Sequence, residues 1–175
     1  ETRLQQVLRV LPDNAAALNN LAWVLATKKK PGALESAERA NQLAPNQPAF
    51  MDTLAMVLAD EGQLPRALDL QKRAVEIDPQ GHALRLRLAR LYLQSGDKAA
   101  ARKELEQIAR EAEPGTTEAD EAQGLLGRIC KQLYVNESMQ RNVWAFDITA
   151  EGTLAKKRLI KQFPDHGFDG MRCDV

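Results

Sequence analysis

Apolar residues along the first 129 positions recur at the three- and four-residue spacings of a helical face. A leucine followed by an alanine appears three times, at Leu21-Ala22, Leu54-Ala55 and Leu88-Ala89. Three residues after each alanine comes another large side chain, which is Leu25, Leu58 or Tyr92. The pattern predicts three amphipathic helices of one design.

Prolines divide this pattern into stretches of similar length. Pro12, Pro45, Pro79 and Pro114 each close a helical stretch, at spacings of 33, 34 and 35 residues. A period of about 34 residues fits two short antiparallel helices with their turns. The second helix of each pair carries a small residue at the same place, which is Ala33, Ala67 or Ala101. One pair cannot bury its apolar face alone, so the pairs are expected to stack into a solenoid.

This recurring pattern resembles the tetratricopeptide repeat family. The resemblance implies a mainly α fold, an α-α solenoid over residues 1–129 followed by a short β-rich segment over 131–175. The expected parts of the solenoid are a partial repeat at 1–13, repeats at 14–47, 48–81 and 82–115, and a closing helix at 116–129. The segment GTTEADEAQGLLGRI supports the closing helix, because threonines and carboxylates favour a helix N-terminus.

The family usually binds a peptide or partner protein in a concave groove lined by the first helix of each pair. By position, the resemblance assigns this groove to Asn19, Asn20, Trp23, Asp52, Met56, Leu86, Arg87 and Arg90. Trp23, Met56 and Arg90 occupy equivalent positions and are expected to lie in line. The alternatives are that Trp23 belongs to the core, that the arginines are only solvated, and that the repeats serve as a rigid spacer.

From about Lys131 the period changes from helical to alternating. The segments QLYVNES, NVWAFDI, LAKKRLIKQF and MRCDV are rich in the residues that favour strands, and the first two are close enough for a hairpin. Four-stranded units of this rhythm are typical of propeller blades. Strands in so short a segment leave exposed edges, and Lys156, Lys157 and Arg158 are expected to protect one against aggregation.

The phrases Tyr-Val, Arg-Asn-Val-Trp-Ala-Phe-Asp, Gly-Thr-Leu and Asp-Gly-Met in this segment resemble the gluconolactonase/regucalcin-like (SMP-30-type) six-bladed propellers. The resemblance implies that Asp169 is a ligand of a divalent metal such as Ca²⁺ in a lactone hydrolase. The family's other ligands come from a first-blade Glu and a preceding Asn, in parts that this chain does not contain. We therefore expect no cofactor, and a metal only if that site were complete.

Composition and single motifs exclude several functional classes. The net charge is zero, which argues against nucleic-acid binding, and no apolar run reaches the roughly 20 residues of a membrane span. His82 stands alone, without a nucleophile or an orienting carboxylate placed by the sequence. We expect no enzymatic activity. The chain opens on Glu1, which suggests a piece of a longer or processed protein.

The sequence favours a non-catalytic scaffold that binds a protein or peptide. One alternative is a fragment of a metal-dependent lactone hydrolase fused to the repeats. Another is a spacer in a cell-envelope or exopolysaccharide assembly, because LNNLAWVLA and AFMDTLAMVLA resemble bacterial repeat proteins of such systems. Two locations are left as alternatives, the bacterial periplasm or envelope and the cytoplasm.

Overall fold

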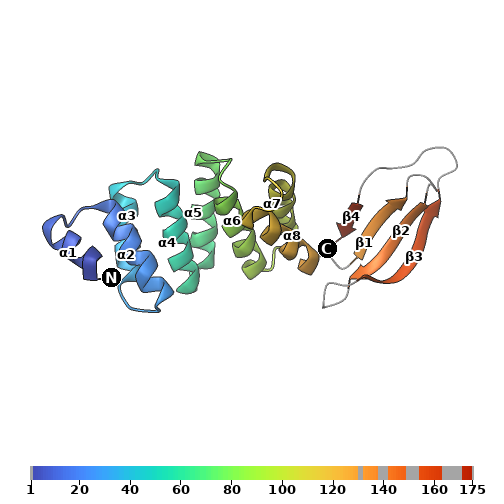
Figure 1. The fold of residues 1–175 in the computed structure, drawn as a ribbon. Coiled ribbons are helices and arrows are strands. Elements are labelled where there is room, and N and C mark those ends of the chain that lie inside the picture. Colours follow the sequence, from blue (N-terminus) through green and yellow to red (C-terminus); the bar gives the residue numbers. More distant parts are fainter. Residues whose placement is uncertain (1, 130–131, 138–141, 149–153, 163–170, 175) are drawn as a thin grey trace. The chain divides into compact units, whose positions relative to one another are not determined.

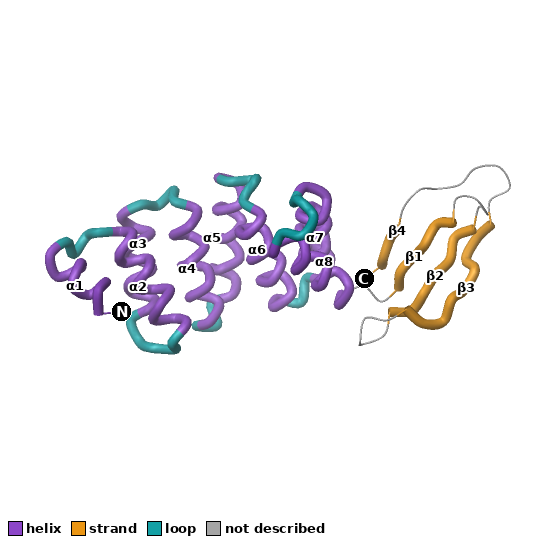
Figure 2. Tube along the Cα trace, viewed as in Figure 1, coloured by secondary structure: helices purple, strands orange, loops and turns teal. Residues whose placement is uncertain are grey.

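A computed structural model of the chain describes residues 2–129, 132–137, 142–148, 154–162 and 171–174. Residues 2–129 form eight helices (Figures 1 and 2). They are α1 (Thr2–Val10), α2 (Ala15–Thr27), α3 (Ala33–Leu43), α4 (Pro48–Asp60), α5 (Leu64–Ile77), α6 (His82–Ser95), α7 (Lys98–Glu111) and α8 (Thr117–Ile129). Their bounds confirm the predicted helix pairs.

The contacts divide the chain into two compact units. The N-terminal unit comprises residues 1–104 and the C-terminal unit comprises residues 105–175, so the division falls within α7. The sequence pattern instead places the change at about residue 130, where the helical period gives way to alternation.

Local sequence explains where the helices begin and end. The Asn14 side chain accepts a hydrogen bond from the Ala17 amide at 2.9 Å and caps α2, and Pro48 occupies the first position of α4. Gly96 ends α6 with a φ of 85°, a left-handed conformation that glycine adopts without strain. The Asp97 side chain then accepts from the Ala100 amide at 2.9 Å. These residues fix the short connections within the repeats.

Small residues allow the helices of the N-terminal unit to pack closely. Ala22, Ala55 and Ala89, which occupy equivalent positions in α2, α4 and α6, are all 0% exposed. Ala67 and Ala74 of α5 are likewise 0% exposed. Side chains of this size let neighbouring helix backbones approach, and leucines fill the remaining space. The sequence prediction of an alanine-lined helix contact is confirmed.

The first helices of the repeats, α2, α4 and α6, form a row of helices in contact and are here called the inner helices. Each helix from α1 to α6 contacts the next, and in addition α2 contacts α4 and α4 contacts α6. Within residues 2–104, the second helices α3 and α5 contact each other less closely than α2 and α4 do. A stack of pairs that touches more along one row of helices curves toward that row.

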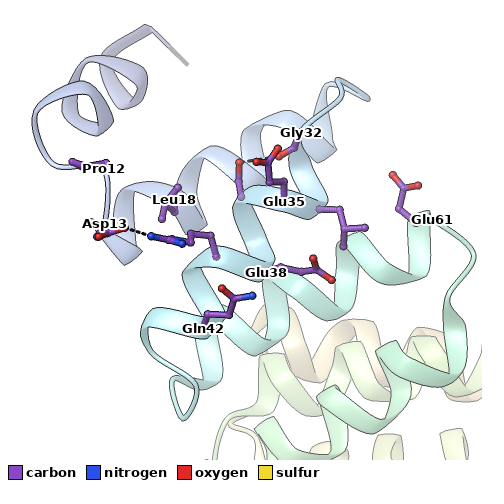
Figure 3. A pocket seen from close by; sticks show the side chains of 11 residues that line it. Pro12, Asp13, Leu18, Gly32, Glu35, Glu38, Gln42 and Glu61 are labelled. Atoms are coloured by element: carbon purple, nitrogen blue, oxygen red, sulfur yellow. Dashed lines mark hydrogen bonds and ion pairs between the residues drawn. The ribbon is translucent and has the colours of Figure 1, made fainter.

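One pair of equivalent positions, one on the first helix and one on the second helix of each repeat, carries different kinds of side chains in the three repeats. It is occupied by Leu18 and Ser36 in the first repeat, by Met51 and Leu70 in the second, and by Arg85 and Glu104 in the third. Leu18 and Ser36 line a hollow of about 920 Å³ along α3, here called the α3 hollow (Figure 3). Met51 is instead 0% exposed. The first repeat therefore leaves space where the second is filled.

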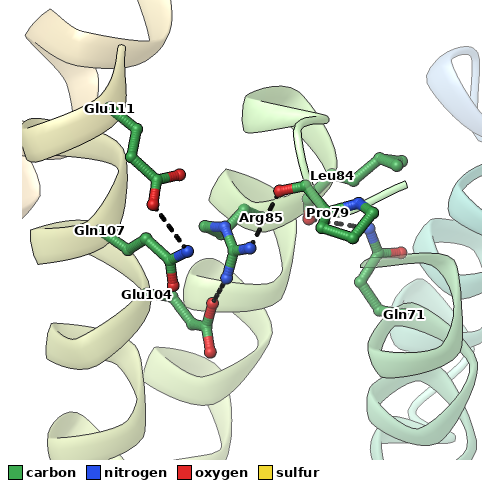
Figure 4. A network of polar contacts seen from close by, with 7 residues as sticks. All are labelled: Gln71, Pro79, Leu84, Arg85, Glu104, Gln107 and Glu111. Carbon is green, nitrogen blue, oxygen red and sulfur yellow. Dashed lines mark hydrogen bonds and ion pairs between the residues drawn. The ribbon is translucent and has the colours of Figure 1, made fainter. Parts of the chain in front are cut away.

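In the third repeat the same positions carry a buried ion pair. Arg85 Nη1 donates to Glu104 Oε2 at 2.6 Å, and Nη2 donates to the Pro79 carbonyl at 3.0 Å (Figure 4). The two side chains are 8% and 15% exposed. Arg85 Nε is buried and has no partner within the described residues. The sequence analysis did not single out this pair.

The described strands of the C-terminal unit form one antiparallel sheet. They are β1 (Gln132–Glu137), β2 (Asn142–Ile148), β3 (Leu154–Gln162) and β4 (Met171–Asp174), in the spatial order β3-β2-β1-β4. These bounds confirm the four predicted strands. Because the fourth strand lies beside the first, the order is that of a Greek key. The sheet order was not predicted from the sequence.

Strand β3 is an edge of this sheet and is irregular. Its pairing with β2 shifts register twice, and Lys156 adopts a φ of 50° at the second shift. Lys157 Nζ lies 4.1 Å from the centre of the Trp144 ring and 5.9 Å from that of Phe146. Bulges and lysines on an edge strand oppose edge-to-edge pairing. Their position agrees with the protective role that the sequence predicts for Lys156, Lys157 and Arg158.

Candidate partner-binding groove

The predicted groove residues come from the three inner helices. Asn19, Asn20 and Trp23 lie on α2, Asp52 and Met56 on α4, and Leu86, Arg87 and Arg90 on α6. We call this set the inner-helix row. Their neighbouring helices are in contact, so side chains from successive repeats can reach one another. Their burial and partners differ widely.

Asp52 and Arg87 form an ion pair between successive inner helices. Arg87 Nε donates to Asp52 Oδ1 at 2.6 Å, and the two side chains are 30% and 20% exposed. Gln71 Nε2 donates to the same oxygen at 2.8 Å. The half-buried Asp52 carboxylate is therefore paired with one cation and one neutral donor. Asp52 is thus neutralised locally and contributes little negative field to the groove.

The apolar members of the row divide between core and surface. Leu86 is 5% exposed and belongs to the core, so it presents almost no area to a partner. Met56 is half-buried and packs against the hydrophobic core. Trp23 is 52% exposed, although it directly follows the buried pair Leu21-Ala22. The alternative that Trp23 is a core residue therefore does not hold.

The remaining polar members are accessible to different degrees. Asn20 and Arg90 are exposed, and Asn19 is half-buried. The Asn19 Oδ1 atom is buried and has no hydrogen-bond partner among the described residues. A buried carbonyl oxygen without a partner carries a desolvation cost that a donor would remove. Asn19 occupies the position in α2 that Asp52 occupies in α4.

Gln71 is the residue of this region that sequence reasoning missed. It lies on the second helix α5, is 0% exposed, and also donates to the Leu84 carbonyl of α6 at 2.9 Å. It therefore links its own repeat to the next and holds Asp52 in place. The sequence did contain a signal for it, because Gln71 is polar at a position where the other two repeats carry the apolar residues Ala37 and Leu105.

Removing the Asp52 carboxylate is expected to destabilise the repeats measurably. Asp52→Ala leaves one hydrogen of the buried Gln71 amide without an acceptor and lowers the free energy of unfolding by about 2 kcal/mol. Asp52→Asn keeps an acceptor oxygen, as Asn19 does in the first repeat, and is expected to cost less than about 1 kcal/mol. Urea denaturation followed by helical circular dichroism measures both. Equal losses for the two variants would contradict this role.

The predicted metal ligand is not one of the groove residues. Asp169 falls outside the residues that the structure describes. Within the described segments, no three His, Cys, Asp or Glu side chains are grouped so that they could hold a metal ion. The helices among these residues are also too short or too polar for any of them to span a bilayer.

Two family models match the helical part of the chain. Both describe the tetratricopeptide repeat, one over residues 1–48 and the other over residues 58–129. These segments belong to the tetratricopeptide repeat family. Neither model extends past residue 129, so the matches to tetratricopeptide repeats end before the sheet begins. No curated protein sequence matches the chain.

Solved structures show the same fold. The chain is 21% identical to MamA, covering 70% of this chain and 72% of MamA, with a TM-score of 0.59. It is 22% identical to the type III secretion translocator chaperone SycD of Yersinia enterocolitica, covering 67% and 84%, with a TM-score of 0.58. It is 24% identical to YrrB, covering 69% and 62%, with a TM-score of 0.59. At these identities the likeness establishes the repeat fold.

Proposed function

We propose that this tetratricopeptide repeat chain is a non-catalytic scaffold that binds a peptide or partner protein through its inner helices. The exposure of Trp23 carries the proposal. A tryptophan that leaves half of its surface in water contributes little to the fold, whereas tryptophan is among the residues that dominate binding energy at interfaces. Arg90, at the equivalent position two repeats on, is also exposed.

Two structural neighbours are consistent with this role. YrrB is described as a repeat protein with an unusual peptide-binding site, and SycD as a translocator chaperone. Both share the helical arrangement that this chain shows. The Asp52–Arg87 pair adds a fixed polar point to the inner-helix row, which would set the register of a bound peptide.

The test begins with a random peptide library displayed on phage and selected against the full chain. Binding of a selected peptide is then measured by fluorescence anisotropy. The combined variant Trp23→Ala, Arg90→Glu is expected to weaken binding at least about thirtyfold, because each substitution removes an interface anchor. Helical circular dichroism should stay unchanged, since neither side chain is buried.

Leu43→Ala is the matched control. Leu43 is 41% exposed, like Trp23 a large apolar side chain at the surface, but it lies on the second helix α3. Its removal is expected to leave peptide binding intact. If the selected peptide bound the Trp23 and Arg90 variant as tightly as the wild type, the inner-helix row would not be the site. If no peptide were enriched, the spacer alternative would be favoured.

A further inference from the structure

The α3 hollow is separate from the inner-helix row, with which it shares no residue. Pro12, Leu18, Gly32 and Leu34 give it an apolar lining, Ser36 adds a small side chain, and these five residues are here called its floor. The Ser36 hydroxyl donates to the Gly32 carbonyl at 2.8 Å, so its polar atom turns back to the helix. Figure 3 labels Pro12, Leu18 and Gly32 among the residues that line the hollow. The floor therefore offers apolar contact to a side chain from outside.

The hollow forms where the first repeat carries the small side chain of Ser36 in place of a leucine, while Leu18 and its counterpart Met51 are of similar volume. Where the second repeat has Met51 and Leu70, the first has Leu18 and Ser36. The third repeat fills the corresponding space with Arg85 and Glu104. Apolar space of this kind lacks the dispersion contacts that a filled position makes. An apolar side chain of a partner would supply them.

The charged residues that line the hollow, here called its rim, favour a positively charged occupant. Asp13, Glu35, Glu38 and Glu61 line it, against one cation, Arg39. Arg39 is already paired with Asp13 at 2.5 Å, and this hydrogen bond and charge raise the pKa of its guanidinium, which stays charged. Carboxylates thus exceed cations by three in a chain whose net charge is zero.

Among the described residues, Glu38 has an ion pair with a cation from outside the hollow, and Glu61 also lines a neighbouring pocket with Lys29 and Lys30. Arg66 Nη2 lies 3.4 Å from Glu38 Oε1, and the two side chains are 60% and 39% exposed. An exposed pair at this distance contributes little and is readily exchanged for another cation. We propose that the α3 hollow is a second docking site, which takes a basic segment of a partner protein with one apolar side chain on its floor.

Three fluorescent peptides test the proposal on the full chain. The first is Lys-Arg-Lys-Leu-Lys-Arg-Lys, the second replaces its leucine with serine, and the third replaces every cation with glutamate. The first should bind, and loss of the leucine should weaken binding about tenfold because a buried apolar side chain is removed. The acidic peptide should show no binding. Equal binding of the first two peptides would overturn the proposal.

Ser36→Leu is the decisive variant. It introduces the residue that the second repeat carries at this position, so the fold should tolerate it, and it changes no charge. It is expected to weaken the leucine-containing basic peptide about tenfold by filling the floor. Unchanged binding would mean attraction to the acidic surface alone and would overturn the site.

The rim and the inner-helix row are tested separately. Glu35→Gln combined with Glu38→Gln should weaken the basic peptide about fivefold, as expected for exposed charge pairs. Asp69→Asn, a carboxylate removed at the position of α5 equivalent to Glu35, should have no effect. Trp23→Ala should also leave binding of this peptide unchanged. Weaker binding of the basic peptide to the Trp23→Ala variant would place the peptide on the inner helices. That result would overturn the inference without affecting the proposed function.

Discussion

Glu104→Leu is expected to lower the free energy of unfolding by about 4 kcal/mol, the typical loss when one partner of a buried ion pair is removed. Arg85 would keep its charge in a site where its side chain is only 8% exposed, with the Pro79 carbonyl as its remaining acceptor. Water cannot replace the lost carboxylate at this burial. Urea denaturation of the full chain, followed by helical circular dichroism, measures the loss.

The second repeat supplies the matched control. Arg85→Met combined with Glu104→Leu reproduces the apolar pair Met51 and Leu70. Replacing both partners of a buried ion pair with apolar residues is often neutral or stabilising, so this double variant should recover at least the wild-type stability. A double variant as unstable as Glu104→Leu alone would show that the pair is needed for more than charge compensation.

Ala55→Leu is expected to destabilise the N-terminal unit by about 3 kcal/mol, at the upper end of the usual cost of overpacking a core. Ala55 is 0% exposed and lies on α4, which contacts α2, α3, α5 and α6. The added atoms would force these helices apart and break the close contact between repeats. The midpoint of thermal unfolding should fall in parallel with the urea midpoint.

Ala49→Leu serves as the control for that substitution. Ala49 lies on the same helix but is exposed, so the larger side chain meets solvent. The free energy of unfolding is expected to change by less than about 0.5 kcal/mol. Destabilisation equal to that of Ala55→Leu would mean that leucine in α4 acts through something other than packing.

The fold was largely predictable because the same pattern of leucines and alanines recurs in three successive repeats. The spacing of Leu21-Ala22, Leu54-Ala55 and Leu88-Ala89 fixes both the helical face and the length of the repeat. The burial of these alanines follows from helix periodicity alone. The strands were predictable in the same way, since alternation marks each of them, but pairing of β4 with β1 depends on contacts distant in sequence.

The candidate site was predictable only in part. Position within the repeat placed Asp52 and Arg87 on neighbouring inner helices, but their ion pair depends on side-chain directions that no pattern contains. The same rule placed Leu86 in the groove, whereas the structure buries it. Gln71 reaches Asp52 from a different helix, and such a contact becomes visible only when the helices are assembled.

By itself, the sequence determined the helix pairs, their stacking and the tetratricopeptide repeat family, because these depend on residue spacing along the chain. Only the tertiary structure decided which polar residues pair, which apolar residues stay exposed, and where space is left. Trp23 and Leu86 were both assigned to the groove from their places in the repeat and have opposite exposures, at 52% and 5%, since burial is set by what packs above a side chain. The α3 hollow, likewise, lies where the small Ser36 of α3 and Leu18 of α2 come together, and such a space becomes visible only when the helices are assembled.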